Sequence, residues 1–276
     1  MNLTNKEIIH TIGENLDYIQ FRRLLEYKDI LSHAYSLKNP KINFGPNLSK
    51  EECLNNYQSI CKELNLNASN IIRPYQKHTW NIKNIIEKKS KVIEYNPSYL
   101  DETDGLITNK KDIILSTTNA DCILFLLFDP IKKVIANVHS GWRGTLKEIV
   151  ISVVKQMELD YNSNPKDIIC CICPSIRKCH FEVDIDVRNL FYNKFSYLSN
   201  INEIIEPKEK KYHIDTVLLN KTLLIKCGLK EENIIDSNIC SVCHSSNINS
   251  YRVDKENYKL STAIITLNQW NINKNI

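Results

Sequence analysis

Cys122 and His139 lie at the two ends of one hairpin-sized segment, and a thiol and an imidazole can bind a metal ion or exchange a proton. The segment, residues 119–144, reads NADCILFLLFDPIKKVIANVHSGWRG. Its Asp-Pro pair and following lysines predict a turn between two apolar runs. A two-residue turn between Asp129 and Lys132 would place Cys122 opposite His139, with Cβ atoms about 4.5–5.5 Å apart. The segment therefore predicts a site in which the two side chains share a metal ion or a proton.

His78 is the third candidate, and it lies in a strand-like run over residues 70–82. Together with Cys122 and His139 it would provide three ligands and leave a fourth position open, as in catalytic zinc sites. Copper would also accept these ligands. The plainer interpretation is a buried free cysteine and two structural histidines. Small and polar residues around the strand ends favour a site instead.

The loop after His139 has the composition of an anion-binding site. Gly141 and Gly144 would let a ligand approach the backbone, and Arg143 offers a planar fork for an oxyanion. Thr145 is expected to cap the helix that follows, and a helix N-terminus carries free N–H groups and positive potential. This loop is predicted to hold a phosphate or a carboxylate.

Capping residues and β-rich runs predict the elements that position these side chains. Helix starts are predicted at Ser49 with Glu52, at Thr145 with Glu148, at Asp184 and at Asp215. Strands are predicted over residues 18–37 with a break near 28–29, 70–82, 105–108, 113–117, 122–128, 134–139, 168–173, 234–240 and 260–267. Short loops in the middle favour hairpins over parallel crossovers, so we expect one α+β domain with mixed or antiparallel sheets.

Length and charge exclude several classes of protein. The chain has 276 residues, 42% of them hydrophobic, which suits a globular fold with a real core. Its net charge of +4 is spread without a basic block, so no nucleic-acid partner is expected. No apolar run approaches the roughly 18 residues of a membrane span, and no signal peptide opens the chain. We expect a cytoplasmic protein with no membrane partner, and a monomer.

The other cysteines are expected to be mostly thiols in that compartment. Cys240 and Cys243 belong to a C-x-x-C-H sequence with the spacing of covalent haem attachment, but we interpret them as thiols at a strand end. The cysteines of the apolar strand over 168–173 are assigned to the core. Cys179-His180 could join a metal site, yet only one convincing ligand trio is found. Structural roles are assigned to His10, His33, His180, His213 and His244.

The order of several motifs resembles the YfiH-like family, long described as multicopper polyphenol oxidases or laccase-domain proteins and now as purine nucleoside phosphorylases. The resemblance covers roughly residues 30 to 268, and its strongest pair is Ala-Asp-Cys with His-x-Gly-Trp-Arg-Gly. The motifs are Gln76-Lys-His78, Asp104-Gly-Leu-Ile-Thr108, Ala120-Asp-Cys122, His139-Ser-Gly-Trp-Arg-Gly144, Cys173-Pro-Ser-Ile176, Phe181-Glu-Val183, His213-Ile-Asp215, Asn220 and Ser250-Tyr-Arg252.

This resemblance implies an α/β/β/α layered fold, a zinc ion, and phosphorolysis of adenosine, inosine and methylthioadenosine with adenosine deamination alongside. It implies that His78, Cys122 and His139 form the metal-binding or catalytic set. Arg252 would touch substrate, and Lys38 stands where the family usually has an arginine that we expect to bind phosphate or substrate. The catalytic domain would span residues 30–276, after an extension and first strand in residues 1–29.

Two other functions remain open at this point. Without a metal, Cys122 would be a nucleophile and His139 its base in a cysteine hydrolase or amidase. A copper oxidase or redox protein is the other alternative, although a laccase requires several coppers.

Overall fold

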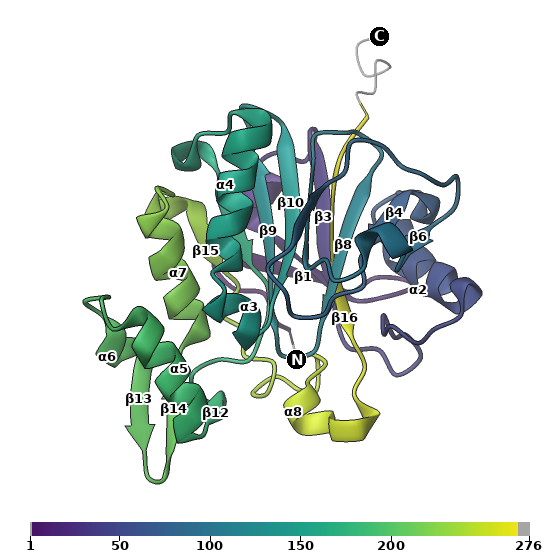
Figure 1. Cartoon of the computed structure of the whole chain (residues 1–276). Helices are drawn as coiled ribbons and strands as arrows, with labels where there is room; N and C mark the ends of the chain where they lie inside the picture. The colour runs from purple at the N-terminus through teal and green to yellow at the C-terminus, as the bar shows by residue number, and fades with distance from the viewer. Residues whose placement is uncertain (1, 270–276) are drawn as a thin grey trace.

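The predicted hairpin lies at the centre of a six-stranded sheet in the computed structural model, which describes residues 2–269 (Figure 1). Its strands are β9 (Ile123–Asp129) and β10 (Val134–Ser140), and every residue of both is buried. Burial on both faces explains why the two runs are almost continuously apolar. The sheet order is β15-β11-β9-β10-β7-β5, with β15 (Ile234–Asp236), β11 (Ile169–Ile172), β7 (Gly105–Thr108) and β5 (Ile82–Asn84).

A seven-stranded sheet packs against this one, in the order β1-β2-β3-β16-β8-β4-β6. Its strands are β1 (Ile8–Thr11), β2 (Tyr18–Phe21), β3 (Leu31–Ser36), β16 (Ser261–Leu267), β8 (Ile114–Asn119), β4 (Ile71–Arg73) and β6 (Glu94–Tyr95). Because β1 and β2 continue the sheet from β3, the described part of the first 29 residues packs with the rest. The domain boundary at residue 30 remains a prediction, and residues 270–276 lie outside the described residues.

Helices cover the outer faces of the two sheets, and a small third sheet extends one end. The helices are α1 (Arg22–Leu25), α2 (Lys50–Glu63), α3 (Trp142–Leu146), α4 (Ile149–Tyr161), α5 (Ile185–Phe195), α6 (Ile201–Ile204), α7 (Thr216–Lys226) and α8 (Tyr251–Asp254). The third sheet has the order β12-β14-β13, with β12 (Glu182–Val183), β14 (Lys211–Ile214) and β13 (Ile205–Lys208).

Three apolar cores define four layers. Leu126 of β9 and Ile265 of β16 belong to the core between the two sheets. The opposite face of β9, including Phe125, packs on α4, α5 and α7, while α2 covers the outer face of the seven-stranded sheet. Alternate residues of one strand therefore serve two cores. The expected α+β fold with mixed and antiparallel sheets is confirmed.

The predicted register of the hairpin is wrong by two residues. Val134 pairs with Asp129, and His139 lies opposite Leu124 rather than Cys122. The turn is longer than expected because the Asp129 carboxylate accepts hydrogen bonds from the N–H groups of Ile131 and Lys132, both at 2.9 Å. A shift by two residues keeps each side chain on its predicted face, since strand side chains alternate with a period of two.

Three of the four predicted helix starts hold, and one is wrong. Ser49 and Glu52 form the expected capping box of α2, and the Asp215 carboxylate accepts the N–H of Leu218 at 2.8 Å. α5 begins after Asp184 as expected, although its side chain makes no capping hydrogen bond. Thr145 does not begin a helix, because it lies inside α3, where its hydroxyl contacts Ser140 Oγ at 3.0 Å.

None of the helices in the described part of the chain is both long and apolar enough to span a membrane.

Candidate active site

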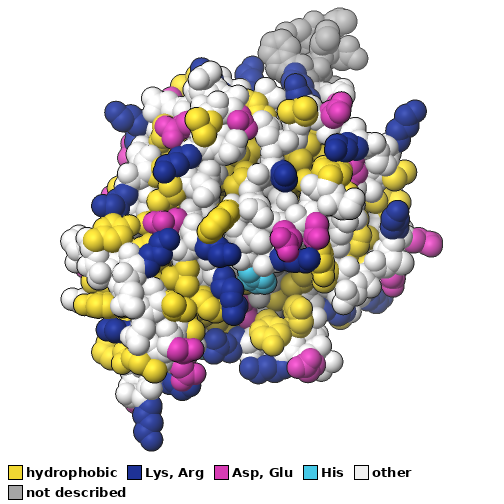
Figure 2. Space-filling view, in the orientation of Figure 1, with side chains coloured by type: hydrophobic (Ala, Val, Ile, Leu, Met, Phe, Trp, Pro, Cys, Tyr) yellow, Lys and Arg dark blue, Asp and Glu magenta, His cyan; other side chains and the backbone are white. Residues whose placement is uncertain are grey.

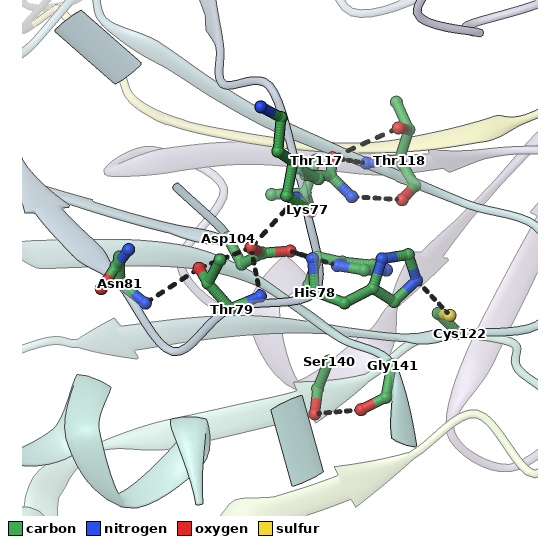
Figure 3. Close-up of polar contacts among 12 residues, drawn as sticks. Lys77, His78, Thr79, Asn81, Asp104, Thr117, Thr118, Cys122, Ser140 and Gly141 are labelled. Atoms are coloured by element: carbon green, nitrogen blue, oxygen red, sulfur yellow. Dashed lines mark hydrogen bonds and ion pairs between the residues drawn. The ribbon is translucent and has the colours of Figure 1, made fainter. Parts of the chain in front are cut away.

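The three predicted ligands come from three separate segments and meet at one end of the sheets. Cys122 directly precedes β9, His139 lies in β10, and His78 lies in the loop between β4 and β5. Their ligand atoms all lie within 4.8 Å of one another, and Cys122 Sγ is 3.7 Å from His78 Nε2 (Figure 3). The strand predicted over residues 70–82 is wrong in its middle, because His78 adopts a left-handed backbone conformation with φ of +58°.

Asp104 holds this arrangement together from a fully buried position just before β7. Its carboxylate accepts the N–H groups of Lys77 at 3.2 Å, His78 at 3.0 Å and Thr79 at 2.7 Å, and the Thr79 hydroxyl at 2.7 Å (Figure 3). It also lies 2.8 Å from His139 Nδ1. A carboxylate only accepts hydrogen bonds when ionised, so Nδ1 carries the proton and Nε2 of His139 is free to bind a ligand.

The role of Asp104 was not predicted from the sequence, where it appeared only as part of a family motif. An acidic residue directly before a wholly buried strand was the available indication, because a buried carboxylate requires partners.

The pKa values of Asp104, His139 and Cys122 depend on one another, because the three side chains are in contact. Burial alone would raise the pKa of Asp104, but hydrogen bonds from His139 and Thr79 lower it to about 2. Burial would lower the pKa of His139, yet Asp104 and Cys122 raise it to about 9. Burial would raise the pKa of the Cys122 thiol, but hydrogen bonds with His139 and His78 lower it to about 6. Without a metal ion, the group therefore favours a thiolate beside an imidazolium.

The geometry fits a tetrahedral metal ion with one open position. Bond lengths of about 2.3 Å for Zn–S and 2.0–2.1 Å for Zn–N predict S···N separations of about 3.5 Å, close to the 3.7 Å between Cys122 and His78. Ligating histidines usually donate their other ring N–H to a carboxylate or carbonyl, and His139 makes this hydrogen bond to Asp104. These residues define a candidate Cys/His metal site.

Two glycines make room for the group, although neither is shown to bind an anion. A Cβ atom at Gly141 would overlap the His78 ring and lie 3.2 Å from Cys122 Sγ. A Cβ atom at Gly144 would lie 3.3 Å from the Thr79 carbonyl oxygen. Gly141 therefore permits the close approach of the ligand segments.

The group lies in a pocket of about 650 Å³, and a histidine is visible in the depression on the face drawn in Figure 2. This volume suits a small organic ligand. Aromatic side chains on the pocket wall are Tyr75, Trp142, Phe181, Tyr251 and Tyr258. Polar side chains there include Arg73, Gln76, Asp121 and Arg252.

The predicted anion-binding residues do not all reach this pocket. Arg252 lines it. Arg143 is exposed, and its guanidinium carbon lies 4.1 Å from the centre of the Trp142 ring. Lys38 pairs with Asp254 at 2.8 Å, and neither residue is part of the pocket lining.

Arg73 is a pocket residue that sequence reasoning missed. It is 2% exposed, and its Nη2 donates to Thr118 Oγ1 at 3.1 Å. Its Nε has no hydrogen-bond partner among the described residues. Because this Nε atom is itself buried, it does not show that a ligand is bound; the charged guanidinium in the pocket lining is what makes Arg73 a candidate for binding an anion.

Six of the other cysteines fall into two groups. Cys170, Cys171 and Cys173 are buried, as expected. A second Cys/His group unites Cys179, His180, Cys240 and Cys243. The sequence analysis found one convincing ligand trio, and the structure adds this second candidate group because residues far apart in sequence meet where two loops pair.

A sandwich of two sheets between helices, with a Cys/His ligand group in a pocket, defines a class of α+β proteins with a candidate metal centre. Within this class, a sequence model of the family described as multi-copper polyphenol oxidoreductase laccase matches residues 34–268, so the chain belongs to that family. The YfiH-like resemblance is thereby confirmed. The structure is similar to that of Bacillus licheniformis hypothetical protein YfiH, with a TM-score of 0.82, 23% identity, and coverage of 94% of this chain and 98% of the other.

Curated relatives carry two kinds of enzyme name. Purine nucleoside phosphorylase YlmD of Bacillus subtilis is 33% identical over 162 residues, which are 59% of this chain and 57% of that protein. The match thus spans less than two thirds of YlmD. Purine nucleoside phosphorylase CA_C1699 of Clostridium acetobutylicum is 29% identical over 87% of this chain and 94% of its own length. Adenosine deaminase RL5, from an unknown prokaryotic organism, is 29% identical over 75% of this chain and 79% of its own length.

Replacing Asp104 by Asn is expected to weaken zinc binding at the trio by about 10- to 100-fold. All contacts of both carboxylate oxygens come from donors, so an amide NH₂ in either orientation would face donors. Chelator competition would measure the zinc affinity. The matched control is Asp101→Asn, whose exposed side chain pairs with Lys77. Unchanged affinity in Asp104→Asn would contradict the role given to this carboxylate.

In metal-free protein, Cys122 is expected to react rapidly with iodoacetamide down to about pH 6. A lowered pKa keeps the reactive thiolate as the pH falls, and the rate should drop only below that pKa. Mass spectrometry of alkylated peptides would give the rate at each pH. Cys227 is the internal control, because burial raises its pKa and its reaction should require alkaline pH. Equal pH profiles for the two cysteines would contradict the coupling of Cys122 to the histidines.

Proposed function

We propose that this protein is a metal-dependent purine nucleoside phosphorylase that cleaves purine nucleosides with phosphate. The observation that carries the proposal is the occurrence, in one pocket, of a His₂Cys ligand group and the guanidinium of the largely buried Arg73. The names of several relatives point to the same reaction.

Phosphorolysis places demands that the pocket residues can meet. A phosphate oxygen forms a bond to C1′ of the ribose while the C1′–N9 bond breaks, and its electron pair passes to the purine. The guanidinium groups of Arg73 and Arg252 would bind and orient the phosphate. Zinc bound by His78, Cys122 and His139 would supply Lewis-acid polarisation. The aromatic wall would stack on the purine and exclude water from the reacting atoms.

The proposed substrates are adenosine, inosine and methylthioadenosine. Their purine rings share a flat apolar face, which suits the tyrosines of the wall, where the rings of Tyr251 and Tyr258 lie 5.1 Å apart edge to face. Adenosine deamination is proposed as a side activity, supported by the name of one relative. Phosphate-binding roles for Gly141 and Gly144 rest on the resemblance alone. Those for Arg143 and Lys38 gain no support from their positions outside the pocket.

A metal-free cysteine hydrolase is the second candidate. The observation that favours it is the thiolate–imidazolium pair formed by Cys122 and His139, with Asp104 orienting the histidine as the third member of a triad. A copper oxidase is supported by the description of the family. Metal content of protein purified without added metal distinguishes these candidates from a zinc enzyme. Cytoplasmic location and a monomeric state remain predictions.

Incubation of the purified protein with adenosine is expected to yield adenine and ribose 1-phosphate only when phosphate is present. The Cys122→Ala variant should lose this activity by at least about 100-fold, because one metal ligand is removed. Chromatography of the products, with circular dichroism to verify folding, provides the measurement. Inosine alone would show a deaminase, and near-normal turnover by folded Cys122→Ala would contradict the assignment.

Replacing Arg252 by Met is expected to raise the KM for phosphate by about 10- to 100-fold, since one charge-assisted hydrogen bond contributes about 1.5–3 kcal/mol. Arg143→Met removes the same charge from a side chain outside the pocket lining, and its KM should stay within about threefold of the parent value. Steady-state kinetics with phosphate varied at saturating adenosine would test both. A larger rise in KM for Arg143→Met than for Arg252→Met would contradict this assignment and support a phosphate site at the loop after His139.

A further inference from the structure

Cys179, His180, Cys240 and Cys243 bring four metal-binding atoms together outside the pocket. Cys179 Sγ lies 3.6 Å from Cys240 Sγ and 3.8 Å from Cys243 Sγ. His180 Nδ1 lies 3.2, 3.7 and 3.5 Å from the sulfur atoms of Cys179, Cys240 and Cys243. Each thiol thus contacts the same imidazole nitrogen, and Cys179 contacts both other thiols.

These separations match the edges of a tetrahedron around zinc. Zn–S bonds of about 2.3 Å give S···S edges of about 3.8 Å, and Zn–N bonds of 2.0–2.1 Å give S···N edges of about 3.5 Å. A disulfide would need a sulfur–sulfur distance of about 2.05 Å. The three cysteines are free thiols in the structure.

Backbone pairing between two loops holds the four residues in place. Ser175 and Cys240 form a parallel bridge, in which the Ser175 N–H donates to the Ile239 carbonyl at 3.3 Å and the Ser241 N–H to the Ser175 carbonyl at 3.0 Å. Cys243 follows in the turn directly after the bridge, at the C-x-x-C spacing of zinc sites.

We propose that Cys179, His180, Cys240 and Cys243 bind a second zinc ion in a closed structural site. Three thiolates and one imidazole select zinc over hard cations such as magnesium and calcium. Four protein ligands leave no position for substrate, which separates this site from the trio in the pocket. His244, the other histidine of this segment, is engaged elsewhere, since its Nδ1 lies 3.1 Å from the Cys240 carbonyl oxygen.

The consequence of this zinc ion would be a rigid wall for the pocket. The loop that carries Cys179 and His180 also supplies Ile176 and Phe181 to the pocket lining. On the other loop, the Ser241 hydroxyl donates to Asp121 at 2.6 Å, directly before Cys122. A closed zinc site would join these two loops across roughly 60 residues of sequence and reduce their freedom.

Zinc content of the full chain, purified without chelator, tests the proposal by elemental analysis. The parent protein should bind two zinc ions per chain, and the double variant Cys179→Ser with Cys243→Ser should bind one. Both replaced side chains are exposed, so the fold should survive. His78→Ala should lose the other ion, and Cys227→Ser, a partly exposed cysteine outside both groups, should retain two. The double variant should also melt at a lower temperature than Cys227→Ser.

Cobalt substitution gives a second readout that does not depend on activity. Cobalt in a site of three thiolates should give intense sulfur-to-metal absorption that persists in His78→Ala. In the double variant this absorption should fall to the weaker band of the single thiolate Cys122 in the pocket site. One zinc ion that is lost in His78→Ala and retained in the double variant would overturn the second site while leaving the pocket metal intact. A disulfide among Cys179, Cys240 and Cys243 in protein purified anaerobically would also overturn it.

Discussion

The fully buried carboxylate of Asp104 accepts five hydrogen bonds, and the pocket depends on this cluster of contacts. Three come from consecutive backbone N–H groups, so the loop that carries His78 must curl around the carboxylate. Another comes from His139 on the neighbouring strand. A buried charge of this kind is stable only when all its partners are present, and this requirement couples two ligands from distant segments. The left-handed conformation of His78 is the local cost of this arrangement.

Much of the sheet architecture could be predicted, because strands such as β7 and β9 are short, largely apolar runs that are recognisable in the sequence. The register of the hairpin could not, since two hydrogen bonds to the Asp129 carboxylate decide how many residues the turn contains. The loop around His78 resembled a strand for a related reason. Its composition favours a strand, but the hydrogen bond from the His78 N–H to Asp104 makes it a curved loop instead. These two residues are 26 positions apart in sequence, so composition does not reveal the contact.

The grouping of Cys122 with His139 could be predicted from the sequence, because the hairpin brings both to the same end of the sheet. A shift of the register by two residues does not change this. Arg73 was not within reach, because only the fold places this buried guanidinium in the lining of the pocket. The second Cys/His group was missed for a similar reason. Cys179 and Cys240 are 61 positions apart, and only the pairing of Ser175 with Cys240 brings them together.

Asp121 connects the two Cys/His groups mechanically. One of its carboxylate oxygens accepts the Ser241 hydroxyl and the other accepts the N–H of Arg252, both at 2.6 Å, while its carbonyl accepts the N–H of Ile176 at 2.8 Å. A displacement of either loop must therefore pull on the residue that precedes Cys122. Ligand positions in a metal centre tolerate errors of only about 0.5 Å, so rigidity in these loops bears directly on the pocket. The chain thus supports its ligand trio from both sides, with the charge of Asp104 behind the histidines and the paired loops behind the cysteine.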